Sequence, residues 1–194
     1  MAIKTCVSLY SLQDEYINKR MTLEDIMKYL AENKVEGLEL LPDQMIHNTP
    51  HPSEESLKHW DYLMETYKIK PVCSDVFLNT NLYNNRTLTK RECIDLLIDE
   101  IKLAHRMGFH LIRFVSMVPA FVIEPLLPYA EKYDVAFALE IHAGMSFGIP
   151  ETRGFIEEMI RVDSPYCGLV VDAGIFCRRI PRVYNDYNMK VLGT

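Results

Sequence analysis

Short apolar runs alternate along the chain with longer segments in which apolar residues recur every three or four positions. The first pattern is typical of strands covered on both faces, and the second of amphipathic helices. The apolar runs predict six strands, at residues 3–10, 37–41, 70–77, 111–116, 135–142 and 168–174.

The segments between these strands predict five helices. Thr22 and Ser53 suit the N-cap of two of them, because a hydroxyl oxygen there accepts a free N–H of the first turn. Gly108 suits the C-terminal end of a third helix. Residues 119–133 also read as a helix, but Pro125 and Pro128 predict that it is broken or irregular there.

Regular alternation of strand and helix predicts a parallel sheet with right-handed crossovers, either an open sheet or a closed barrel. No G-x-G-x-x-G or GxxxxGK[ST] motif follows a strand, so nothing favours a nucleotide-binding open sheet. Functional groups of a barrel lie where its strands end. Polar residues occupy those positions here, namely Glu39, Ser74, Asp75, Ser116, Glu140, His142 and Asp172. The sequence therefore predicts an α/β fold, a parallel (β/α) TIM-type barrel in one domain over residues 1–194.

The length of the chain limits this barrel. A complete (β/α)₈ barrel takes about 250 residues, whereas the 194 residues supply six of the eight βα units. Six strands leave two edges with unpaired backbone groups. We expect the sequence to be a fragment that lacks the last units; the alternative is that a partner closes the edges. Homo-oligomers are expected for the chain alone.

Composition narrows the class of protein. Hydrophobic residues make up 48% and charged residues 25%, with a net charge of −6, which is ordinary for a globular protein and argues against a nucleic-acid partner. The five cysteines form no CxxC pair, which indicates reduced thiols. No signal peptide or membrane-spanning run is evident. We therefore expect a cytoplasmic protein without a membrane partner.

Three residues at the strand ends suggest the chemistry. Glu140 and His142 are two positions apart, so they share one face of a strand. Glu140 and Asp172 end neighbouring strands about 4.8 Å apart, where two buried carboxylates would repel each other unless a divalent cation lay between them. His142 is then a ligand, a group behind the ligands or a general base. The alternative is structural: Glu140 caps a loop, His142 is a core residue and Asp172 begins a turn with Gly174.

Four motifs occur in an order typical of one family. These are SLYSL on the first strand, VEGLELL on the second, LEIHAG on the fifth and VVDAGIF on the sixth. Over essentially its whole length the chain resembles the sugar phosphate isomerases and epimerases, which are xylose isomerase-like barrels. The resemblance implies one divalent metal ion, Mn²⁺ first, with Mg²⁺, Co²⁺ or Zn²⁺ as alternatives.

The same resemblance assigns ligands. It implies that Glu140 is the first metal ligand and Asp172 the second, while the His and Glu of the last two strands would lie beyond Thr194. The family often has a substrate-contacting His three residues after the strand-six Asp. Ile175 stands there in this sequence and offers no polar group for that contact.

A narrower resemblance rests on fewer residues. DAGIFCRRIPR together with LEIH is similar to the catalytic subunit of bacterial C-glycoside deglycosidases, which pair with a small β-rich subunit. It implies a metal bound to oxygens of a 3-oxo sugar, with His142 as the base.

Three further residues are candidates for substrate binding. Glu39 ends the second strand, and it either binds a substrate hydroxyl or pairs with a lysine. His47 lies in the loop after the second strand. It either contacts the substrate or belongs to a solvated loop without a role in binding. Arg178 begins a basic stretch after the sixth strand, suited either to an anionic group or to a solvated turn.

Four functions compete at this point. The first is a metal-dependent sugar or sugar phosphate isomerase or epimerase, in which Glu140 and His142 serve proton transfer beside a metal-bound carbonyl. The second is a C-glycoside deglycosidase, a C–C lyase acting on a 3-oxo glycoside. The third, an endonuclease IV-like nuclease, lacks the histidines it needs on the early strands. The fourth is a non-catalytic remnant of such a barrel.

Overall fold

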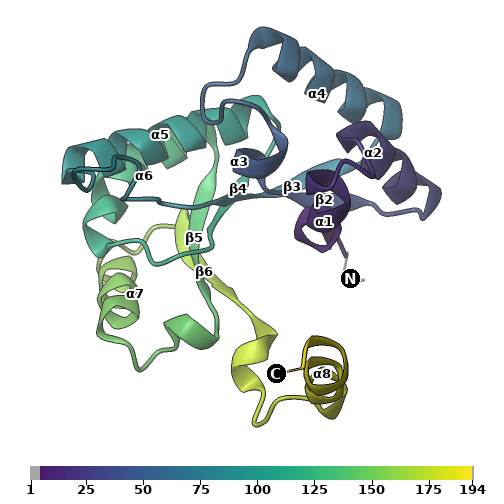
Figure 1. The fold of residues 1–194 in the computed structure, drawn as a ribbon. Coiled ribbons are helices and arrows are strands. Elements are labelled where there is room, and N and C mark those ends of the chain that lie inside the picture. The colour runs from purple at the N-terminus through teal and green to yellow at the C-terminus, as the bar shows by residue number, and fades with distance from the viewer. Residues whose placement is uncertain (1–4, 194) are drawn as a thin grey trace.

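The computed structural model describes residues 5–193, which form one parallel sheet of six strands in the order β1-β2-β3-β4-β5-β6, with helices on its outer side (Figure 1). Each strand pairs with the next one along the chain, so the connections are βα units of the kind that build a TIM barrel. The strands are β1 (Val7–Ser8), β2 (Gly37–Leu40), β3 (Lys70–Val76), β4 (Leu111–Phe114), β5 (Ala136–Ile141) and β6 (Cys167–Val171).

The longer helices are α2 (Leu23–Glu32), α4 (Glu54–Tyr67), α5 (Lys90–Arg106), α6 (Ile123–Tyr133) and α7 (Pro150–Val162). The short helices are α1 (Gln13–Ile17), α3 (Pro42–Met45) and α8 (Arg182–Tyr187). The 3₁₀ turns are η1 (Leu9–Leu12), η2 (Ala120–Val122), η3 (Ala143–Met145) and η4 (Ala173–Phe176), and a π-helical turn, η5, covers Asn188–Leu192.

All six predicted strands form, but the first and the sixth are shorter than expected. The sixth was expected over residues 168–174, whereas β6 ends at Val171 and η4 follows. The first strand was expected over residues 3–10, but β1 holds only Val7 and Ser8. Residues 9–12 turn into η1 instead, where the Ser8 hydroxyl accepts the N–H of Tyr10. A local side-chain hydrogen bond has replaced strand pairing there. Residues 3 and 4 of the predicted strand lie outside the described residues.

The helix ends follow the predicted chemistry. Thr22 caps α2 by accepting the Asp25 N–H, and Ser53 caps α4 by accepting the Ser56 N–H. Gly108 follows α5 with a φ of +85°, a backbone conformation that a residue without a Cβ adopts freely.

The prediction of a broken fourth helix is wrong. Helix α6 runs without interruption from Ile123 to Tyr133, although Pro128 lies inside it. Pro125 falls in the first turn of α6, where its missing N–H would have had no partner within the helix. Turn η2 precedes the helix and takes up the remaining irregularity.

The core lies between the sheet and the helices. Leu38, Leu40, Ile112, Phe137 and Leu139 are fully buried on the outer face of the strands, against apolar side chains of the surrounding helices. Successive strand residues point to opposite faces. The intervening positions therefore face the inside of the curved sheet, and there the sequence places polar residues.

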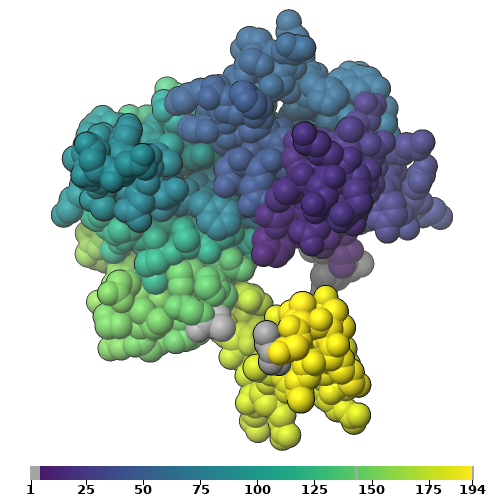
Figure 2. Space-filling model, in the orientation of Figure 1, coloured from purple at the N-terminus to yellow at the C-terminus, as the bar shows by residue number. Residues whose placement is uncertain are grey.

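The two outer strands, β1 and β6, each pair on one side only within residues 5–193. Beyond β6 the chain leaves the sheet, and η4, α8 and η5 form a separate lobe (Figures 1 and 2). None of the helices in the described range has the length and apolar composition needed to cross a membrane.

Candidate functional site

Arg113 is the centre of a charged cluster on the inner face of the sheet. Its Nε and Nη2 donate to the two oxygens of Asp75, each at 2.8 Å. Nη2 also lies 3.1 Å from Oε1 of Glu39, and Nη1 donates to Oε1 of Glu140 at 3.2 Å. One guanidinium therefore holds three carboxylates from three different strands.

Strand register explains why these groups meet. Asp75 on β3 is directly opposite Arg113 on β4, and Glu39 on β2 is opposite Cys73. The β2–β3 register shifts by one residue between Leu38 and Glu39, which returns Glu39 to the face that carries Asp75. Alternation along each strand then directs these side chains inward.

The charged groups of this cluster are largely buried, which changes the protonation of Asp75. The Asp75 side chain is 0% exposed and that of Arg113 is 18% exposed. Burial raises the pKa of Asp75 to about 7, while the hydrogen bonds from Arg113 act in the opposite direction. A guanidinium stays charged under these conditions. It faces three acidic groups, so the pocket has an excess of acidic groups and favours a further cation.

Glu140 and Asp172 line the same cavity of about 500 Å³ as Glu39, Asp75 and Arg113, at the C-terminal ends of the strands. Asp172 follows β6 directly and is exposed; its N–H donates to the carbonyl of Ile141, which ties the ends of β5 and β6 together. Its Oδ1 accepts the Gly174 N–H at 2.8 Å. The turn with Gly174 therefore forms, and Asp172 also faces the cavity.

The donor set of this cavity fits a divalent cation. The contact with Arg113 uses one oxygen of Glu140, and the Gly174 turn uses one oxygen of Asp172. Each carboxylate retains a second oxygen, and carboxylate oxygens suit Mg²⁺ and Mn²⁺. The ligand atoms of Glu39, Cys73 and Asp75 also lie within 4.8 Å of one another. Arg113 already pairs with both carboxylates of that set, and burial raises the pKa of the Cys73 thiol, so this set is the poorer candidate.

His142 follows β5 and is partly buried. Its Nδ1 accepts the N–H of Gly144 at 3.2 Å. A neutral imidazole that accepts at Nδ1 carries its proton on Nε2. In this arrangement Nε2 is a hydrogen-bond donor.

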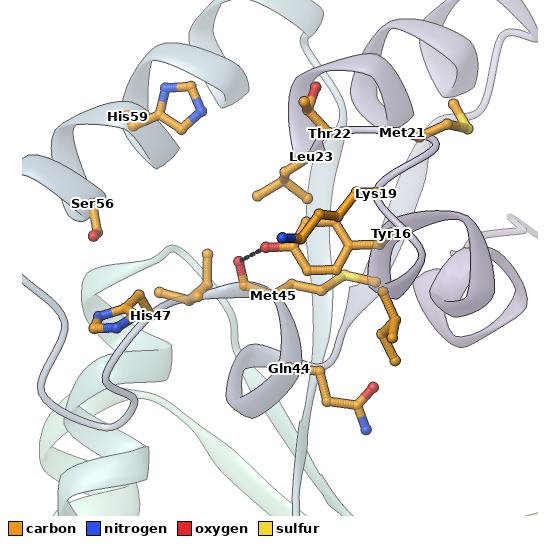
Figure 3. Close-up of a pocket in the computed structure, with 12 residues that line it drawn as sticks. Tyr16, Lys19, Met21, Thr22, Leu23, Gln44, Met45, His47, Ser56 and His59 are labelled. Atoms are coloured by element: carbon orange, nitrogen blue, oxygen red, sulfur yellow. Dashed lines mark hydrogen bonds between the residues drawn. The ribbon is translucent and has the colours of Figure 1, made fainter.

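The remaining predicted residues lie elsewhere. His47 lines a different cavity, of about 690 Å³, between α1, α2, α3 and α4, together with Tyr16, whose hydroxyl donates to the Met45 carbonyl (Figure 3). Arg178 is exposed in the segment after η4. The structure thus brings Glu39, Glu140 and Asp172 together on one cavity. The lining of that cavity does not include His142, His47 or Arg178.

Sequence reasoning missed the roles of Arg113 and Asp75. The sequence marks Asp75 only as a polar residue at a strand end, and Arg113 lies inside the apolar run LIRFVS. The signal was present, because an arginine within a buried strand requires carboxylate partners. Which carboxylates they are depends on the register of four strands, β2 to β5.

The fold and the cavity at its strand ends define the class of protein. The sequence profile of the xylose isomerase-like TIM barrel family matches residues 27–177, and the chain belongs to that family. The sheet is the first six strands of such a barrel, and the sequence-based prediction of family and fold is confirmed.

Comparison with individual proteins narrows this further. The chain is 25% identical over 176 residues to the 3′-dehydrocarminate deglycosidase alpha subunit of a Microbacterium species, covering 90% of this chain and 51% of the relative. It is 27% identical over 171 residues to a C-glycoside deglycosidase alpha subunit of Arthrobacter globiformis, covering 88% and 48%. The chain thus spans about half the length of the curated relatives it matches.

A solved structure supports the fold alone. The IOLI protein with a bound zinc atom superimposes with a TM-score of 0.65 at 20% identity, over 90% of this chain and 64% of that one.

Proposed function

We propose that the protein to which this chain belongs is a divalent-metal-dependent enzyme that cleaves C-glycosides. The observation that carries the proposal is the convergence of Glu140 and Asp172 on one cavity at the strand ends. The relatives named as deglycosidase alpha subunits favour this reaction over sugar isomerisation or epimerisation. Their names also suggest a complex with a second, different subunit.

In this proposal Glu140 and Asp172 hold the metal, each through the oxygen that its contact with Arg113 or Gly174 leaves unused. A bound divalent cation would supply Lewis-acid polarisation of a substrate oxygen. Arg113 orients Glu140, and Asp75 fixes Arg113 through its two hydrogen bonds. Glu39 lies beside Nη2 of the same guanidinium, and its carboxylate can accept a hydrogen bond from a sugar hydroxyl.

The substrate is a 3-oxo sugar linked to its aglycone by a C–C bond. The carbonyl acidifies the hydrogen on C2, so a base that removes it lets the bond from C1 to the aglycone break by elimination. The electron pair of that bond goes to the aglycone carbon, which then takes up a proton. We assign proton exchange to His142. Its Nε2 acts as a base only after the Gly144 N–H is released from Nδ1, because the ring must first change tautomer.

The test incubates the full-length protein, co-expressed with its partner subunit and loaded with Mn²⁺, with a 3-oxo C-glucoside of a flavone. Mass spectrometry would detect the free flavone. Glu140→Gln is expected to lose bound Mn²⁺ and turnover together, because an amide is a poorer ligand than a carboxylate. His142→Ala is expected to keep the metal and lose most turnover.

The outcomes separate the competing functions. Epimerised sugar without release of the flavone would favour the isomerase or epimerase. Full activity of Glu140→Gln would contradict the assigned site. Mn²⁺ binding with neither product would indicate a non-catalytic barrel.

A further inference from the structure

A second cavity adjoins the candidate active site. It measures about 610 Å³ and is built from the loops that follow β2, β3 and β4, with part of α5. These loops lie at the same end of the sheet as Glu39, Asp75 and Glu140. Cavities of 300–1,000 Å³ are the usual size for small-molecule sites.

One side chain connects the two cavities. Phe77, which follows β3 directly, lines both the cavity with Glu140 and the second cavity. Phe77 is 39% exposed and its ring is not part of the buried core. A molecule that extends past this ring would occupy both cavities.

The walls of the second cavity combine apolar surface with neutral polar groups. Leu78, Leu82, Leu96 and Pro50 line it together with Phe77. Leu82 lies in a loop, and 55% of this apolar residue is exposed. The polar groups are the amides of Gln44 and Asn79 and the hydroxyls of Thr49 and Ser116.

The charged residues of this cavity restrict the ligand. Asp43 and Glu100 line it, and among the lining residues of the described chain there is no Lys, Arg or His. Burial raises the pKa of Glu100 to about 8, with Asp43 and Asp99 adding to the rise. Near neutral pH the Glu100 carboxyl is therefore protonated, and it can donate a hydrogen bond as well as accept one. No basic side chain among these lining residues offers a partner for phosphate or carboxylate.

We propose that this cavity is the aglycone subsite of the proposed deglycosidase and takes a neutral polyphenolic ring system while the sugar lies beside Glu140. The inference rests on the proposed function for the identity of the sugar half. Flat aromatic rings suit the surface of Phe77, Leu82 and Leu96, and phenolic hydroxyls suit the amides and hydroxyls around it. The cavity is larger than the one beside Glu140, as a two- or three-ring aglycone requires.

The experiment is equilibrium dialysis of the 194-residue chain against luteolin, a polyhydroxylated flavone. We expect saturable binding at one site per chain. Leu82→Asp should weaken binding at least fivefold, because it places a charge on the apolar wall, and Asn79→Ala should weaken it less. Both residues lie in an exposed loop, so the fold should survive the substitutions.

The matched control is Ile160→Asp. Ile160 is 67% exposed on α7 and lines neither cavity, so this variant should bind luteolin like the unmodified chain. Glucose 6-phosphate, an anionic sugar, should not compete with luteolin. Absence of saturable binding, or an equal loss in Leu82→Asp and Ile160→Asp, would overturn the subsite.

Failure of the subsite differs from failure of the proposed function. If the full-length enzyme releases flavone and Leu82→Asp leaves its KM unchanged, the subsite is wrong and the function stands. If no flavone is released but luteolin binding still depends on Leu82, the aromatic site stands and the reaction is wrong.

Discussion

Large apolar side chains form a buried core in the body of the molecule, but they are exposed to solvent in its C-terminal segment, residues 171–192. In the body, Phe114, Phe137 and Phe155 are almost completely buried. In residues 171–192, nine large apolar side chains are between 47% and 81% exposed. The exposed set there is Val171, Phe176, Ile180, Val183, Tyr184, Tyr187, Met189, Val191 and Leu192.

This difference shows that composition alone does not bury a residue. The two regions contain the same residue types, but the body packs its apolar face against a sheet, whereas α8 and η5 stand apart in the space-filling view (Figure 2). Many exposed apolar side chains on one short segment are typical of a surface that pairs with another surface. The predictions below test the contrast, from the largest expected effect to the smallest.

The largest difference in unfolding free energy between the two regions is expected when a phenylalanine ring is removed from each. Phe137→Ala leaves a cavity beside Phe114, whose ring centroid lies 5.7 Å away, and should lower the free energy of unfolding by about 3–5 kcal/mol. Phe176→Ala, at a side chain 72% exposed, should change it by less than about 0.5 kcal/mol. Urea denaturation measures both. Similar losses in the two variants would mean that the C-terminal segment packs against the body in solution.

A second contrast, within the body, is between a largely buried and an exposed arginine. Arg113→Ala leaves the Asp75 carboxyl buried without its partner and should cost about 3 kcal/mol or more in unfolding free energy. The matched control is Arg106→Ala, which breaks a two-bond pair with Asp61. Both side chains of that pair are over 40% exposed, so its loss should cost no more than about 1 kcal/mol. Equal effects in urea would show that the inner cluster is solvated.

Charge burial predicts a pH dependence for Glu100. Its pKa rises to about 8 from an ordinary 4.5, so the folded chain keeps a proton that the unfolded chain releases between those values. The stabilising contribution is fully present below pH 4.5 and is lost as pH rises through 8. Glu100→Gln should therefore be more stable than the unmodified chain at pH 8.5, on the order of 2 kcal/mol, and similar at pH 5.

The control for this pH effect lies in the C-terminal segment. Asp186→Asn removes a carboxylate from a pair that is largely exposed and should shift unfolding by less than about 0.5 kcal/mol at either pH. Urea denaturation at pH 5 and at pH 8.5 measures the unfolding free energy of both variants. A Glu100→Gln effect that does not grow with pH would contradict the raised pKa.

The smallest change in stability should accompany the clearest change in association. Val183→Ser with Leu192→Ser removes apolar surface from the segment and should leave the free energy of unfolding within about 0.5 kcal/mol. Light scattering should show less self-association at a given concentration, because exposed apolar area drives it. Unchanged association would place the contact at the open edges of β1 and β6 instead.

Local patterns were enough to predict most elements of this protein. Apolar runs located the strands, and Thr22, Ser53 and Gly108 marked helix ends, because a cap depends on residues within one turn. The alternation of strand and helix gave the parallel topology, and the ends of two strands gave Glu140 and Asp172 as neighbours. The prediction failed at residues 9–12 and at Pro128, where a local hydrogen bond and the context of a packed helix outweighed propensity.

Tertiary structure decided which polar residues meet. The pairing of Arg113 with Glu39, Asp75 and Glu140 depends on the register of four strands, including a shift of one residue between β2 and β3. His47 lies in an active-face loop by sequence, yet the path of α3 turns it toward another cavity. A sequence specifies strands and caps through neighbours along the chain, whereas a site is formed by residues tens of positions apart, whose contacts exist only after the sheet has fixed its register.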